Sequence, residues 1–330
     1  MKDFLDPALL FFLLGIAAGA VRSNLEIPPP IARFLSLYLL MALGLKGGFA
    51  LAESGLTAEV AITLGSALGL AIVVPALGYL VLRRVLNGFD AAAVAATYGS
   101  VSAVTFITAA QYLDNHGIAY GGHMAAAMAL MESPAIVMAV LLANMVRRRE
   151  SASTPDPHRP GTSVSPVMPL RRVMHEALTD GAQLLLLGAM VVGILSGDAG
   201  QAAMKPFAGD LFKGMLAFFL LDMGLLAARN MGQLRGTSAW LLAYAVLGPL
   251  VHGSLALLLA LGTGMSPGNG ALLMVLAASA SYIAVPAVIR HAIPEAKPSL
   301  YFGLSLGLTF PLNILVGIPL YVATARWALG

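Results

Sequence analysis

The sequence of 330 residues contains no cysteine. That absence excludes disulfides, thiolate metal sites and cysteine nucleophiles. Charge is also scarce, because Asp, Glu, Lys and Arg together make up 11% of the chain, whereas soluble domains carry about a quarter. So few charges cannot cover a surface in water, and we therefore expect the chain to lie in a lipid bilayer. The net charge is only +3, and the basic residues form no stripe along the sequence. Both observations argue against a nucleic-acid-binding module.

Several catalytic motifs are missing as well. There is no P-loop, so primary ATP-driven transport by this chain alone is not expected. The stretch "GSVS" at 99–102 lacks the two glycines that flank the serine of a hydrolase elbow. None of the six histidines has the spacing of a metal-binding pair. We expect no enzyme and no cofactor beyond a sodium ion.

Long apolar runs dominate what is present. Apolar residues make up 58% of the chain and the mean hydropathy is +0.84. Runs of about 17–25 apolar residues span a bilayer as helices, whereas a β-barrel shows short alternating segments. The first run also resembles a signal peptide, but Lys2 is offset by Asp3 and Asp6. The sequence predicts an all-α integral membrane protein with ten transmembrane helices, at 6–21, 29–50, 58–84, 90–113, 119–147, 174–196, 207–228, 236–262, 268–291 and 298–327.

The basic residues predict the orientation of these helices. With the N-terminus outside, fourteen of the 19 Lys and Arg residues fall on the cytoplasmic side, as the positive-inside rule requires. We therefore expect a multi-pass protein of the cell inner (plasma) membrane with both termini outside the cytoplasm. Residues 150–172 are rich in Ser, Pro and charge and poor in large apolar groups. They are expected to form a cytoplasmic linker between two five-helix repeats, 1–149 and 173–330.

Two halves with five spans each must be inverted relative to one another if they share a fold. Three short matches preserve their order across the halves. "MALGL" at 41–45 matches "LDMGL" at 221–225, "SVSA" at 100–103 matches "SASY" at 279–282, and "ESPAIV" at 132–137 matches "TFPLNI" at 309–314. Their offsets of 180, 179 and 177 residues favour two inverted repeats.

The second of these matches interrupts the fourth and ninth predicted helices with small and hydroxyl residues. An interrupted helix exposes the first amides of its second half, and these, with the helix dipole, attract an anion. Small residues also allow close helix packing without any ligand, but two such clusters at related positions favour a midplane substrate site. The predicted substrate-binding residues are Gly99, Ser100, Ser102, Thr105, Ser279, Ser281 and Tyr282.

Acidic residues inside predicted spans are candidates for ion coupling, because a carboxylate in the bilayer costs a few kcal/mol. Glu132 lies two residues before Pro134, which frees a backbone carbonyl. Asp222 lies in the seventh span, and Thr309 aligns with Glu132 between the halves. These three residues are the ion-coupling candidates. The alternative is a carboxyl group that only holds helices together.

The segments "ALGLKGGFAL", "YGSVSAVTF", "MESPAIVMAVLLAN", "LGPLVHG" and "LAASASYIAVPAVIRHAIPEAKPSLYFG" resemble, in this order, the sodium-dependent bicarbonate transporters of cyanobacteria. The resemblance covers nearly the whole chain. It implies five-plus-five inverted repeats, a core domain rocking against a gate domain, a homotrimer, and sodium-coupled bicarbonate uptake. It also implies a small PII-like regulatory protein as a partner at the central loop.

The chain departs from that family at the ninth span. Tyr282, Ala284 and Val285 stand where the family usually has an acidic residue, a serine and a glycine, and Val104 replaces a serine in the fourth span. The predicted function is secondary active transport of a small anion, foremost bicarbonate with sodium, by alternating access. One alternative is another small anion such as a carboxylate, coupled to sodium or protons. The other is a membrane sensor that does not transport.

Overall fold

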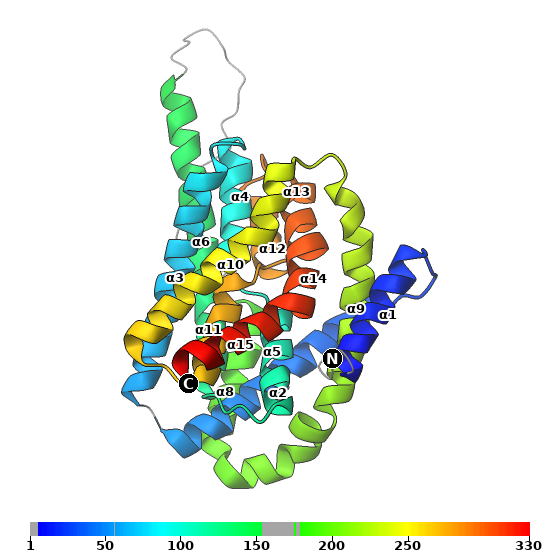
Figure 1. Ribbon diagram of the computed structural model, residues 1–330, viewed down its shortest axis with the longest axis vertical. Coiled ribbons are helices and arrows are strands. Elements are labelled where there is room, and N and C mark those ends of the chain that lie inside the picture. Colours follow the sequence, from blue (N-terminus) through cyan, green and yellow to red (C-terminus); the bar gives the residue numbers. More distant parts are fainter. Residues whose placement is uncertain (1–5, 56, 154–174, 176–178) are drawn as a thin grey trace.

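The computed structural model describes residues 6–55, 57–153, 175 and 179–330, and within these ranges it is helical without strands (Figure 1). The all-α prediction is confirmed for this part of the chain. The first half contains α1 (Pro7–Ala20), α2 (Pro29–Ser54), α3 (Ala58–Leu82), α4 (Gly88–Gly99), α5 (Ala103–Asn115) and α6 (His123–Ser153). The second half contains α8 (Gly181–Met204), the π-helical η2 (Lys205–Asp210), α9 (Phe212–Met231), the short η3 (Gly232–Leu234), α10 (Ala239–Thr263), α11 (Pro267–Ala278), α12 (Ala284–Ala292), α13 (Pro298–Leu304), η4 (Ser305–Thr309), α14 (Phe310–Leu312), η5 (Asn313–Gly317) and α15 (Ile318–Leu329).

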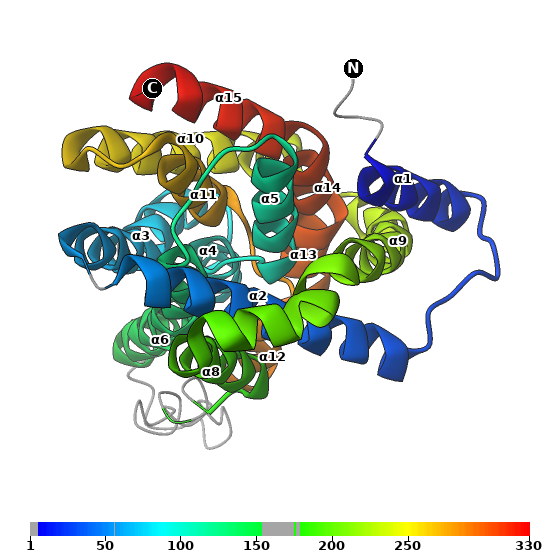
Figure 2. The same cartoon turned by 90° about the horizontal axis from the view of Figure 1, so that it is seen from below.

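Two layers face each other in this arrangement (Figure 2). α1 packs along α9 and α2 packs along α8, and we call these four helices the panel. The other layer, the core bundle, joins α3, α4 and α6 to α10, α11 and α15. The half-helix α5 packs on α11 in the core bundle and also contacts α2 of the panel.

Polar residues at the helix starts explain several boundaries. Asp6, Asn87 and Ser266 precede α1, α4 and α11, and each side-chain oxygen accepts a hydrogen bond from an amide in the first turn. Such a cap satisfies a donor that has no partner within the helix. The starts predicted from the apolar runs, 6, 90 and 268, fall within two residues of the observed ones.

Among the described residues, seven segments are long and apolar enough to cross a membrane. Predicted span 207–228 and the part of span 174–196 from Gly181 onward fall within one segment, Gly181–Leu234, because η2 joins α8 to α9. The backbone of α8 is non-helical at Gly197, and this kink follows the predicted end at 196 directly. α1 is a shorter apolar helix of 14 residues, and α11 ends at Ala278. The structure therefore establishes a multi-pass helical protein, and the ten-span count stays a prediction. α6 extends to Ser153, so the first four residues of the predicted linker are helical; its residues 154–172 lie outside the described ranges.

Glycines bring the paired panel helices into backbone contact. A Cβ atom on Gly224 of α9 would lie 3.0 Å from Gly15 Cα of α1, and still closer to the carbonyl oxygen of Phe12. The second pair repeats this packing, because a Cβ atom on Gly193 of α8 would lie 3.0 Å from Gly48 Cα of α2. Small residues permit such close approach of membrane helices.

We expect Gly224→Ala to destabilise the protein by about 2 kcal/mol, because overpacking against backbone costs about 1–3 kcal/mol. Thermal unfolding of the purified protein measures this. Gly214→Ala on the same helix is the matched control, since a Cβ atom there meets nothing within 4 Å. That control should raise stability by about 0.5–1 kcal/mol through helix propensity. Equal behaviour of the two variants would show that the α1–α9 contact is not close.

Candidate functional site

The first predicted interruption separates α4 from α5. Ser100 is extended after Gly99, and Ser102 then caps α5 by accepting a hydrogen bond from the amide of Thr105 at 3.2 Å. Gly99 is required where α4 meets α3, because a Cβ atom would lie 2.6 Å from the ring of Pro75. The break thus combines a close approach of two helices with a serine cap.

The second interruption separates α11 from α12. Ser279 is extended after Ala278, and α12 begins at Ala284. The hydroxyl oxygen of Ser281 accepts a hydrogen bond from the amide of Val285 at 3.3 Å. As in the first break, a serine oxygen binds an amide of the half-helix that follows.

The two interruptions contact each other directly. The amide of Ser102 donates to the hydroxyl oxygen of Ser279 at 3.0 Å, and the amide of Ser281 donates to the carbonyl oxygen of Thr97 at 2.8 Å. Ser279 in turn donates its proton to the carbonyl oxygen of Leu276 at 2.9 Å. The first two bonds join residues about 180 positions apart, and they attach the start of α5 to the end of α11 and the segment before α12 to the end of α4.

A cavity of about 180 Å³, which we call the site cavity, lies at these two helix starts. Its wall includes Ala103 and Val104 of α5 and Ala284 of α12. Their amides lie in the first turn of each half-helix and therefore have no carbonyl acceptor within that helix. Ser102 and Ser281 also line it. Because each serine oxygen already accepts from its own helix, its hydroxyl proton remains available for an anion. The remaining lining residues are Ser36, Leu40, Val101, Met128, Glu132, Ile136, Asp180, Ala182, Gln183, Leu186, Tyr282, Ile283 and Val288.

Glu132 brings a carboxylate to the same cavity. One of its oxygens accepts a hydrogen bond from the Gln183 amide at 2.8 Å, and the Gln183 carbonyl accepts from the Ser133 hydroxyl at 3.3 Å. Donors for an anion and a carboxylate for a cation therefore share one cavity. Sequence reasoning missed Gln183, although its carboxamide precedes a long apolar run near the start of α8.

The other predicted residues lie behind the cavity wall. Gly99, Ser100, Thr105 and Ser279 are not among its lining residues. Within the described part of the chain, the buried hydroxyls of Ser100 and Thr105 have no hydrogen-bond partner. Gly99 and Ser279 shape the two breaks, so their contribution to the site is through the backbone.

Asp222 and Thr309 are also absent from the cavity wall. Asp222 is buried in α9, and the adjacent Met223 sulfur accepts a hydrogen bond from Tyr282 at 3.5 Å. Thr309 donates to the carbonyl oxygen of Ala245 at 2.8 Å, and its oxygen lies 2.6 Å from the Tyr98 hydroxyl. Because Thr309 has only one proton to give, Tyr98 is the donor in that second bond. Of the three ion-coupling candidates, only Glu132 reaches the cavity.

The fold and this cavity define a multi-pass helical membrane protein in which the breaks of two discontinuous helices line a small cavity. Irregular backbone at membrane depth is tolerated where it is buried in protein or lines a cavity. The family model described as the Na+-dependent bicarbonate transporter superfamily matches residues 7–326. The chain belongs to this superfamily, which confirms the family resemblance seen in the sequence. No curated protein significantly matches the chain.

Proposed function

We propose that the protein is a secondary active transporter that takes up bicarbonate together with sodium, by alternating access around the site cavity. The observation that carries this proposal is the contact between two helix breaks whose amide-bearing starts line one cavity. Helix N-termini attract anions through their unpaired amides and the helix dipole. Glu132 in the same wall is the proposed sodium ligand, since sodium is a hard cation that favours oxygen donors.

Related contacts in the two halves support the inverted-repeat arrangement. Asp90, in the first turn of α4, accepts a hydrogen bond from the amide of Lys297 just before α13, at 2.8 Å. Asn269, 179 residues later in the first turn of α11, accepts one from the amide of Gly121 near the start of α6, at 2.7 Å. In each half, a side chain thus accepts a hydrogen bond from the segment that precedes the last helical region of the other half. This reciprocity is what a two-fold relation between the halves predicts.

Uptake into proteoliposomes tests the function. Labelled bicarbonate is offered with an inward sodium gradient, with a proton gradient, and with neither. We expect accumulation only with sodium, because the carboxylate in the site cavity couples the cation to the anion. Absence of gradient-driven bicarbonate accumulation would reject the proposed function.

A second cargo deserves a parallel assay because Tyr282 lines the site cavity. An aromatic ring at a position where the family usually carries an acidic residue makes the wall more apolar, which suits a small carboxylate such as acetate. Competition between labelled bicarbonate and unlabelled acetate distinguishes the two anions. Sodium-driven accumulation of acetate in preference to bicarbonate would identify a small carboxylate as the transported anion.

A further inference from the structure

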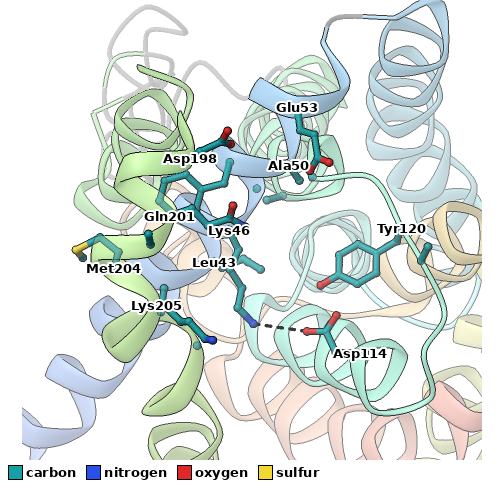
Figure 3. Close-up of a pocket in the computed structure, with 18 of the residues that line it drawn as sticks. Leu43, Lys46, Ala50, Glu53, Asp114, Tyr120, Asp198, Gln201, Met204 and Lys205 are labelled. Atoms are coloured by element: carbon teal, nitrogen blue, oxygen red, sulfur yellow. Dashed lines mark ion pairs between the residues drawn. The ribbon is translucent and has the colours of Figure 1, made fainter. Parts of the chain in front are cut away.

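A second and larger cavity, of about 720 Å³, lies beside the site cavity; we call it the vestibule (Figure 3). None of the described residues lines both cavities. Along α2, Ser36 and Leu40 line the site cavity, whereas Leu43, Lys46 and Glu53 line the vestibule. In α8, Gln183 near the helix start lines the site cavity, and Gln201, beyond the kink at Gly197, lines the vestibule. The two cavities therefore lie toward opposite ends of α2.

Apolar side chains of α2 and α5 separate them, and we call these side chains the septum. On α2 the last residue of the site cavity is Leu40 and the first of the vestibule is Leu43. On α5 the corresponding residues are Val104 and Phe106. These four side chains are buried in one hydrophobic cluster. On α2 the step of three residues advances about 4.5 Å along one face. On α5 the step of two residues turns by about 200°, so the two cavities lie on opposite sides of this half-helix.

Polar contacts across the layers lie at the vestibule end of α5. Lys46 of α2 pairs with Asp114 of α5 at 3.5 Å, and the Lys46 ammonium also lies 4.4 Å from the centre of the Phe212 ring of α9. Figure 3 shows the Lys46 ammonium directed at Asp114 from one side and the Tyr120 hydroxyl approaching from the other. Burial, with a further contribution from Asp114, raises the pKa of Tyr120, so this hydroxyl stays protonated.

The neighbouring residue Asn115 adds two more contacts to the panel. Its carbonyl oxygen accepts a hydrogen bond from Lys213 of α9 at 2.9 Å, and its amide donates to Asp6, the cap of α1, at 2.8 Å. Three panel helices thus bind two consecutive residues at the end of α5. The other end of α5 carries Ser102 at the site cavity.

We propose that the vestibule is the second access route to the site cavity and that Lys46, Asp114 and Asn115 form a clasp that keeps the septum closed. The proposal rests on the proposed transport function. These residues are positioning residues, because they act on α5 rather than on the cargo. Release of the clasp frees the end of α5 from the panel and allows Leu43 and Phe106 to separate, so that the vestibule joins the site.

Cysteine accessibility tests the clasp, since the chain has no cysteine of its own. Ser36→Cys is the reporter in the site cavity and Gln201→Cys is the reporter in the vestibule. A small membrane-impermeant thiol reagent is applied to intact cells or inverted vesicles, whichever preparation exposes Gln201→Cys. In the parent chain, Ser36→Cys should react at least about tenfold more slowly than Gln201→Cys, because the septum is closed.

Loss of the clasp should accelerate the reaction of Ser36→Cys. We expect Asp114→Asn to do so by about two- to fivefold, as for loss of a partly exposed ion pair, and Asp114→Asn with Asn115→Ala to do so by about tenfold. The exchanged pair Lys46→Asp with Asp114→Lys should restore the slow rate. Glu53→Gln, a carboxylate of the same vestibule, is the matched control and should change nothing.

The clasp is overturned if the double variant leaves the Ser36→Cys rate within about 1.5-fold of the parent, or if Glu53→Gln accelerates it equally. Size-exclusion profiles and melting temperatures identify any variant that fails to fold, and Lys46→Met then replaces it. The assay requires no transported cargo. A failure of bicarbonate uptake therefore leaves the test of the clasp intact, and a failed clasp leaves the uptake assay intact.

Discussion

Replacing Ser102 with leucine is expected to abolish uptake while the protein remains folded. The leucine side chain would project into a cavity of only about 180 Å³ and occupy the space beside the first amides of α5. Overpacking costs about 1–3 kcal/mol and loss of the cap at Thr105 about 1 kcal/mol more. Together these terms lower the free energy of unfolding by about 3 kcal/mol, whereas uptake is lost because the leucine side chain occupies the place of the anion.

Initial uptake rates at several bicarbonate concentrations measure this effect, with the melting temperature as a check on folding. Ser254→Leu is the matched control. Ser254 is exposed on α10 and its hydroxyl is bonded to the carbonyl of Leu250, so leucine there faces lipid. Normal uptake by Ser102→Leu would remove Ser102 from the site and with it the assignment of this cavity as the substrate site.

Glu132→Gln is expected to weaken the sodium dependence of uptake by about 30-fold, because loss of one partner of a buried charge pair costs at least about 2 kcal/mol. Stability should change little. Glutamine has nearly the same shape as glutamate, and its carbonyl oxygen still accepts the hydrogen bond from Gln183. The measurement is the sodium concentration that gives half-maximal uptake, at fixed bicarbonate.

Glu59→Gln provides a close control for this variant. Glu59 accepts a hydrogen bond from the Asn269 amide at 2.7 Å, which is the same chemical pairing as Glu132 with Gln183, but Glu59 does not line the site cavity. Its replacement should leave the sodium dependence unchanged. If Glu132→Gln instead abolishes proton-driven uptake and preserves the response to sodium, Glu132 carries a proton. An unchanged response to both ions would make it a structural carboxyl group.

Both variants concern residues that stood out in the sequence, and the reason is local chemistry. The breaks at Gly99 and Ser279 were predictable because glycine and serine interrupt long apolar runs, and Glu132 because a carboxylate is costly in lipid. Apolar composition likewise predicted a helical membrane protein. These features depend on neighbours in the chain and on the solvent, both of which a sequence records.

The count of membrane spans was less predictable. In the part of the chain that the structure describes, seven segments are long and apolar enough to cross a membrane, because η2 joins α8 to α9 and the apolar helices α1 and α11 are shorter. Whether a π-helical turn or a loop joins two helices depends on how they pack. Here Tyr38 of α2 donates a hydrogen bond to the carbonyl oxygen of Phe207 within η2, a contact between residues 169 positions apart that no local pattern reveals.

From sequence alone it follows that the chain crosses lipid as helices, that two of them are interrupted, and that serines and a carboxylate accompany the interruptions. The packed fold is what separates Ser102, Ser281, Tyr282 and Glu132, which face the cavity, from Ser100, Thr105 and Thr309, which do not. It also supplies Gln183 from another helix. The physical reason is that the direction of a side chain depends on the rotation of its helix against partners far away in the chain, and only the long-range contacts set that rotation.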